Sequence, residues 1–165
     1  MDLDTLLEAI RESLLAITEP RFYENERGFQ GQLLIELSRR IPELLPANRA
    51  IIEQEHQKTL DHHGLDIRPD VIIHQPFDPA IHTSRRDGNF AVIELKRRAG
   101  PKKAAEDFES LNSMLEALHY PIGIFINIGH TRTQAAYIPA EARGRIIAFA
   151  TRLTANGVRV VVARA

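Results

Sequence analysis

Residues 90–96, FAVIELK, decide the fold of this chain. They follow a turn signal, DGN at residues 87–89, and have the density of apolar residues that is typical of a strand buried on both faces. Glu94 and Lys96 interrupt the apolar run. Because alternate residues of a strand share a face, both charged side chains point to one side and Leu95 points to the other. The stretch therefore predicts a central strand with two charged groups on one face.

Two shorter strands are expected before this one. Residues 50–56 form the first, and residues 67–73 (IRPDVII) form the second, with Gly64 marking the turn between them. A loop over residues 75–89 then leads to the central strand. Loops of this length tend to be functional or mobile.

Three helices are expected from apolar residues at helical spacing. The first covers residues 3–18 and stops before Pro20. The second begins near Asn25, a suitable N-cap, and ends before Pro42. The third begins at Pro101 and closes before the strand that follows.

The last part of the chain predicts two more strands, one more helix and a final strand. Residues 121–128 (PIGIFINI) have the composition of a core strand, and residues 135–138 form a short one. A helix is expected over residues 140–153, with a stop at Asn156-Gly157, before a strand at residues 158–162. The core order is helix, three strands, helix, strand.

Length and composition limit the classes of protein that the chain can represent. Its 165 residues favour a single domain over residues 1–165, and 44% hydrophobic with 26% charged residues argues against disorder and fibrous repeats. There is no cysteine, so disulfides, thiolate catalysis and cysteine-bound metals are excluded. The sequence shows no signal-peptide features, and no apolar stretch approaches the roughly 20 residues of a membrane span. We therefore expect a soluble, cytoplasmic protein.

The net charge of −1 hides an uneven distribution of charge along the chain. Residues 1–70 carry 8 basic and 14 acidic groups, whereas residues 85–103 carry 7 and 2, and residues 130–165 carry 6 and 1. A locally basic surface that binds nucleic acid is compatible with this balance.

Three acids fall in segments that otherwise require burial, where an ionised group must be paired, bound to metal or neutralised. Asp70 lies directly before three β-branched residues, and Glu94 lies in the central strand. Glu26 falls inside the apolar stripe of the second helix, one turn before Phe29. Gln30 shares the face of Glu26, which makes it a candidate for a supporting hydrogen bond.

Each acid also has a purely structural explanation. Glu26 suits the first turn of a helix because of the helix dipole. Asp70 can cap a turn or pair with Arg68, and Glu94 with Lys96 can form an ordinary cross-strand charge cluster. Taken together these explanations weaken. Three acids and a lysine that converge on one sheet edge would cost several kcal/mol as unpaired buried charge, and a bound divalent cation removes that cost.

The combination resembles the PD-(D/E)XK, or restriction-endonuclease-like, nuclease superfamily. The pattern consists of Pro69-Asp70, then Glu94-Leu95-Lys96 with Glu94 24 positions after Asp70, and an acid in a preceding helix. The resemblance covers about residues 25–128 and includes the core order αβββαβ. It implies an α/β fold with a mixed central sheet flanked by helices, to which the first helix and a C-terminal helix and strand are added. The separation of the two acids is longer than the hairpins common in the superfamily.

The resemblance also implies a metal site. Asp70, Glu94 and the backbone carbonyl of Leu95 would bind Mg²⁺, for which Mn²⁺ can substitute. Lys96 would orient the attacking water and stabilise charge at the phosphate, and Glu26 would support the metal directly or through water. Hard carboxylate oxygens suit Mg²⁺, which can polarise a phosphoryl oxygen and help to deprotonate water.

Basic residues on both sides of the central strand are candidates for contacts with backbone phosphates, although a solvated basic turn is an equal alternative. They are Arg85, Arg86, Arg97, Arg98, Lys102 and Lys103. The seven histidines lack the compact spacing of a zinc site, and His62-His63 beside Gly64 is better explained as a polar turn.

The sequence therefore predicts a Mg²⁺-dependent nuclease that hydrolyses phosphodiester bonds in DNA, in defence, repair or mobile-element processing, with RNA left open as a substrate. The alternative is a non-catalytic nucleic-acid-binding or protein-assembly module on the same fold. A third interpretation is an interaction domain whose first helix docks a partner or forms a homodimer.

Overall fold

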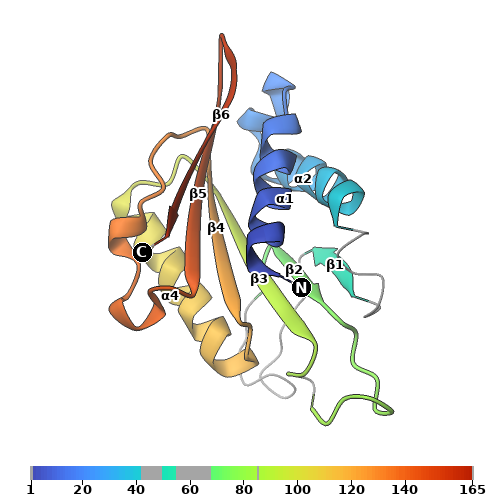
Figure 1. Cartoon of the computed structure of the whole chain (residues 1–165). Coiled ribbons are helices and arrows are strands. Elements are labelled where there is room, and N and C mark those ends of the chain that lie inside the picture. The colour runs from blue at the N-terminus through green and yellow to red at the C-terminus, as the bar shows by residue number, and fades with distance from the viewer. Residues whose placement is uncertain (1, 42–49, 55–67, 85, 165) are drawn as a thin grey trace.

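The chain forms one mixed six-stranded sheet. The computed structural model describes residues 2–41, 50–54, 68–84 and 86–164, and the structural statements below concern these residues. The strands lie in chain order: β1 (Ile51–Gln54), β2 (Val71–His74), β3 (Asn89–Arg97), β4 (Ile122–Ile128), β5 (Ile146–Thr154) and β6 (Gly157–Arg164) (Figure 1). The first three pair antiparallel, β3, β4 and β5 pair parallel, and β6 returns antiparallel to β5.

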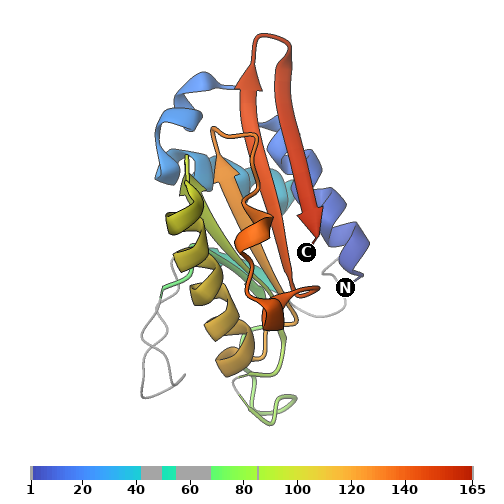
Figure 2. The ribbon, with the colours of Figure 1, turned by 90° about the vertical axis from the view of Figure 1, so that its left-hand side faces the viewer.

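Helices cover both faces of this sheet. On one face lie α1 (Leu3–Ala16) and α2 (Glu26–Arg40), joined by the 3₁₀ helix η1 (Pro20–Glu24). On the other face lies α4 (Pro101–Leu118), with the short 3₁₀ turns η2 (Ala135–Tyr137) and η3 (Ala140–Ala142) beside it (Figures 1 and 2). Each face has its own buried apolar cluster, so the fold class is α/β with three layers.

The apolar stripe of the first helix is buried inside the chain. Leu6, Ile10 and Leu14 are almost completely inaccessible and belong to the cluster between the sheet and α2. The predicted helix is confirmed. Its apolar side packs against the sheet and α2. The interpretation of this helix as a docking surface for a partner therefore lacks an exposed apolar face. None of the described helices is long and apolar enough to cross a membrane.

Most of the predicted elements are confirmed with small shifts in their ends. The second helix begins after Asn25, whose side-chain oxygen accepts from the backbone N–H of Arg27, and the third begins at Pro101. The strand expected over residues 67–73 starts only at Val71. The turn expected at Gly64 and the pair His62-His63 lie outside the described residues.

Two predictions near the C-terminus are wrong. The strand expected over residues 135–138 is the 3₁₀ turn η2, and the helix expected over residues 140–153 is the turn η3 followed by strand β5. The run IIAFAT at residues 146–151 is buried throughout and pairs with β4, so tertiary pairing overrides its apparent helical spacing. Residues 155–156 are accordingly a hairpin turn, because Thr154 pairs with Gly157. The C-terminal addition is therefore a strand hairpin.

Candidate active site

The candidate site lies where β2 ends and β3 continues. Val71 is the first residue of β2 and pairs with Ile93, whereas β3 extends to Arg97. The backbone groups of Leu95 and Arg97 face the side where β2 is missing, since their neighbours bond to β4 on the other side. The sheet therefore has a gap in its ladder beside the last residues of β3.

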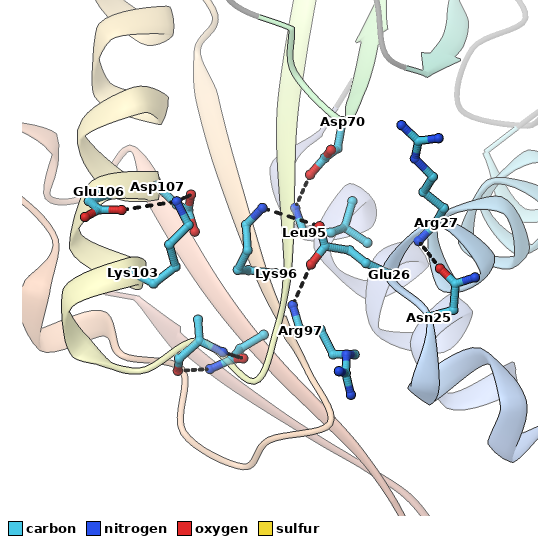
Figure 3. A network of polar contacts seen from close by, with 12 residues as sticks. Asn25, Glu26, Arg27, Asp70, Leu95, Lys96, Arg97, Lys103, Glu106 and Asp107 are labelled. Carbon is cyan, nitrogen blue, oxygen red and sulfur yellow. Dashed lines mark hydrogen bonds and ion pairs between the residues drawn. The ribbon is translucent and has the colours of Figure 1, made fainter.

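Two carboxylates take the place of the missing strand. The Asp70 Oδ2 atom accepts a hydrogen bond from the Leu95 N–H at 2.7 Å, and the Glu26 Oε2 atom accepts from the Arg97 N–H at 2.8 Å (Figure 3). Hydrogen bonds to an ionised acceptor are stronger than bonds between neutral groups. The Leu95 carbonyl lies on the same strand edge as its N–H, so it also faces this gap.

Gln30 fixes Asp70 from the opposite side. The Gln30 side chain is buried at 3% exposure, and its Nε2 donates to the Asp70 backbone carbonyl at 2.7 Å. Asp70 is thus held at its carbonyl by α2 and at its carboxylate by β3. The predicted sharing of one helix face by Gln30 and Glu26 is confirmed, since both side chains reach the same edge of the sheet.

Glu94 and Lys96 project to the α4 face, and Leu95 projects to the α1 and α2 face. Leu95 belongs to the buried cluster that includes α1 and α2. The Glu94 and Asp70 carboxyl groups lie close enough to shift each other's pKa. The Lys96 Nζ atom forms an ion pair with Glu26 Oε1 at 3.4 Å. Elements far apart in the sequence therefore bring Glu26, Asp70, Glu94 and Lys96 together.

The carboxyl groups of this site are held in an unfavourable environment. Burial raises the pKa of Glu94 well above its ordinary value, and the charges of Asp70 and Asp107 raise it further. Burial also raises the pKa of Asp70, against the lowering effect of the Leu95 N–H and Lys96. For Lys96, burial lowers the pKa, but the carboxylates of Glu26, Asp107 and Asp70 outweigh burial and raise it. The site has an excess of negative charge that favours a cation or a proton.

Asp107 is a member of this site that the sequence analysis missed. It lies on α4, is 8% exposed, and its charge affects the pKa of both Glu94 and Lys96. The signal was present in the sequence, because Asp107 falls within the apolar stripe of α4 beside Ala104, Phe108 and Leu111. The criterion that identified Glu26 would have identified Asp107 as well.

Asn127 is a second residue that sequence reasoning missed, and it shapes the turn behind the site. Its fully buried side chain accepts from the Ala99 N–H at 2.9 Å and donates to the Ala99 carbonyl at 3.1 Å and the Arg132 carbonyl at 3.0 Å. These bonds join the end of β4 to the segment between β3 and α4. The polar Asn127 inside the apolar strand IGIFINI was the available signal.

The predicted phosphate contacts divide into two groups. Arg97, Arg98 and Lys102 are exposed near the carboxyl end of β3, beside the carboxylate cluster. Lys103 also lies there, but its Nζ is within 3.1 Å of Glu106 and 3.6 Å of Asp107. Arg86 lies at the other end of β3, where its Nη1 is 3.4 Å from His119 Nε2. Arg85 lies outside the described residues.

The donor set fits a hard divalent cation. Within the described ranges, no three histidine, aspartate or glutamate side chains are grouped closely enough to hold a metal by themselves. Mg²⁺ does not require such a cage, because it usually keeps several waters and binds one or two carboxylates. The candidate ligands, Asp70, Glu94 and the Leu95 carbonyl, offer oxygen atoms only. The cluster also has more acids than lysines: the carboxyl groups are those of Glu26, Asp70, Glu94 and Asp107, and the ammonium groups are those of Lys96 and Lys103.

Comparison of the chain with models of protein families, with curated proteins and with solved structures found no match in any of the three.

Proposed function

We propose that this protein is a Mg²⁺-dependent nuclease of the PD-(D/E)XK type that hydrolyses phosphodiester bonds in DNA. The observation that carries the proposal is the convergence of Asp70, Glu94 and Lys96 at the end of β3, where Asp70 Oδ2 is held 2.7 Å from the Leu95 N–H. The order of α2, β1 to β3, α4 and β4 supports the αβββαβ core of this superfamily. The antiparallel pairing of β2 with β3 and the parallel pairing of β3 with β4 also support it.

Asp70, Glu94 and the Leu95 carbonyl would hold the cation, with Glu26 supporting it through water. A bound Mg²⁺ would supply polarisation of a phosphoryl oxygen and a water that loses its proton more readily. The chain itself contributes rigidity. Gln30 and the Leu95 N–H fix Asp70 at two points, so its carboxylate needs little reorganisation on binding.

Lys96 supplies positive charge beside this cation site. Its ammonium group is 3.4 Å from Glu26 Oε1 (Figure 3). At a reacting phosphate, an ammonium in this position stabilises the negative charge that develops on the oxygens and orients the attacking water.

The exposed Arg97, Arg98 and Lys102 support a nucleic acid as substrate. All three are exposed and lie within a few residues of Lys96 in the chain, at the carboxyl end of β3 and the start of α4. Positive charges placed beside a negative catalytic cluster can hold backbone phosphates while the cluster binds the cation. Arg86 does not belong to this surface, and we do not include it in the proposed contact.

The test is cleavage of labelled single-stranded, duplex and branched DNA and of RNA, with Mg²⁺, Mn²⁺ or EDTA. Wild-type protein is expected to cut DNA only with a divalent cation. Asp70→Asn retains an acceptor for the Leu95 N–H and removes the charge, so it should lower the rate by about 100-fold or more, as should Lys96→Ala. Glu109→Gln, an exposed acid on α4, is the control and should cut at the wild-type rate.

Two outcomes would contradict the proposal. Cleavage that survives in Asp70→Asn and Lys96→Ala would show that the activity arises elsewhere. DNA binding that is unchanged by EDTA, without cleavage of any substrate, would favour the binding-module alternative. Circular dichroism spectra of all variants exclude unfolding as the cause of lost activity.

A further inference from the structure

Asp107 occupies a position on α4 where an apolar residue would be expected. Its neighbours along the buried stripe of the helix are Ala104, Phe108 and Leu111, which pack against the sheet. Glu94 and Lys96 project from β3 toward the same face. Asp107 is therefore a charged residue on the face of α4 that covers the charged end of β3.

One oxygen of Asp107 has no explanation in the packing of the helix. Oδ1 lies 3.6 Å from the Lys103 Nζ, but Oδ2 is buried and has no hydrogen-bond partner among the described residues. The side chain is 10% exposed, against 52% for the adjacent Glu106, which also pairs with Lys103. A buried carboxylate oxygen without a partner opposes folding, so an apolar residue would suit the helix better.

The neighbouring cation that Asp107 can serve is Lys96. Figure 3 places the Lys96 side chain between Asp107 on α4 and Glu26 on α2. Glu26 Oε1 is 3.4 Å from the ammonium group, while its other oxygen is bound to the Arg97 N–H.

We propose that Asp107 is a positioning residue for Lys96: its buried, unpartnered carboxylate oxygen attracts the ammonium group from the α4 side, beyond the distance of an ion pair, while Glu26 pairs with it from the α2 side. The role of this pair in catalysis rests on the proposed nuclease function, whereas the pairing itself does not. With two anionic neighbours on opposite sides, the flexible lysine stem is confined to the edge beside Asp70 and Glu94. Asp107 has no contact with the reacting phosphate in this scheme.

A double-mutant cycle tests the pairing without any activity. Asp107→Asn and Lys96→Met are made singly and together, and thermal unfolding is recorded in EDTA. Asp107→Asn should lower Tm by about 3 °C more when Lys96 is present than when it is replaced. The matched control is Glu106→Gln, whose effect on Tm should be the same in both backgrounds within about 1 °C.

Kinetics then test the consequence for catalysis. If the protein is a nuclease, Asp107→Asn should lower kcat about 10-fold, with KM and the Mn²⁺ dissociation constant from calorimetry unchanged within about twofold. Asp107→Glu should restore part of the kcat, because it keeps the charge. Glu106→Gln should match wild type in kcat.

The outcomes separate the two proposals. Absence of coupling between Asp107 and Lys96 overturns this inference even if the protein cleaves DNA. A loss of Mn²⁺ affinity in Asp107→Asn without coupling to Lys96 also overturns it, because Asp107 would then be a cation ligand. Coupling in a protein that cleaves nothing would retain the pairing and reject the nuclease.

Discussion

Glu94 bears the strongest electrostatic conflict of any single residue in the site. Burial and the adjacent Asp70 raise the pKa of Glu94, so the metal-free folded state binds a proton at this carboxyl more tightly than the unfolded chain does. Stability that depends on this proton is fully present below the pKa of the unfolded glutamate. It is lost as pH rises through the higher pKa of the folded state.

Glu94→Gln is therefore expected to stabilise the metal-free protein. The amide is neutral and can donate to the Asp70 carboxylate as the protonated acid does, so at pH 8 we expect a rise in free energy of unfolding of about 1 kcal/mol, or a few degrees in Tm. Thermal unfolding in EDTA from pH 5 to pH 8 measures this. Wild-type Tm should fall with pH more steeply than that of Glu94→Gln, and the two should converge at low pH.

Addition of Mg²⁺ provides the complementary measurement. The cation should raise the Tm of wild type at pH 8 and leave that of Glu94→Gln nearly unchanged, because ligand binding stabilises only the state that binds it. Equal Tm values for the two proteins at every pH would mean that Glu94 is not in conflict with its surroundings.

At this scale the sequence predicted residues whose charge conflicts with a regular apolar pattern. Glu26, Asp70 and Glu94 were found in this way, and the structure brings them to one edge of the sheet. Asp107 carries the same signal, a charge inside the apolar stripe of a helix. The placement of Arg86 could not be derived, because it depends on the path of a long loop that local rules do not determine.

Among the elements, the segment between β3 and α4 depends on Asn127 of β4. The Asn127 side chain replaces backbone pairing at the point where β3 has ended, since it bonds both the N–H and the carbonyl of Ala99. This arrangement fixes where α4 begins and therefore how Asp107 and Lys103 face β3. A strand residue thus controls the position of a helix that contacts the site.

Asn127→Ala should destabilise the protein by about 2–3 kcal/mol, because it leaves the buried N–H of Ala99 without a partner and removes two donated hydrogen bonds. Chemical denaturation measures the loss. Asn156→Ala, in the exposed turn between β5 and β6, serves as the control, with an expected change below about 0.5 kcal/mol. A similar loss in both variants would mean that the Asn127 bonds contribute little.

The elements that sequence patterns predicted well are those with clear ends. Pro20, Asn25 and Pro101 delimit helices that are confirmed. Residues 146–153 were predicted as the greater part of a helix over residues 140–153, because a short apolar run satisfies helical spacing and strand composition equally. Pairing with β4 on one side and β6 on the other decides between them, and such long-range pairing is absent from a local window.

In the whole molecule, arginines lie at both ends of the parallel strands, but only those at the carboxyl end of β3 are close in the chain to the carboxylate cluster. Arg97 and Arg98 are exposed at the carboxyl end, next to the carboxylate cluster. Arg86 lies before the amino end of β3, and Arg143 lies before the amino end of β5, which runs in the same direction. These two pairs carry equal charge at opposite ends of the parallel strands, so they allow a comparison at constant net charge.

If DNA lies across the carboxyl end of the parallel strands, only the first pair should contact its phosphates. Arg97→Gln with Arg98→Gln should raise KM for DNA about 10-fold, leave kcat unchanged within about twofold, and reduce the slope of log affinity against log salt by about 2. The Arg97 backbone N–H keeps its bond to Glu26 in this variant, so the site remains assembled.

Arg86→Gln with Arg143→Gln removes the same charge and should leave KM and the salt slope near wild type. Fluorescence anisotropy between 50 mM and 200 mM salt, with cleavage assays at each concentration, separates the two cases. If long-range attraction by net charge dominated, both double variants would lose affinity to a similar extent, because each removes two positive charges. A loss of DNA affinity confined to the Arg97 and Arg98 variant therefore indicates direct contact with phosphates beside the Asp70 and Glu94 carboxylates. Equal losses of affinity in the two double variants would contradict binding of DNA at this end of the sheet.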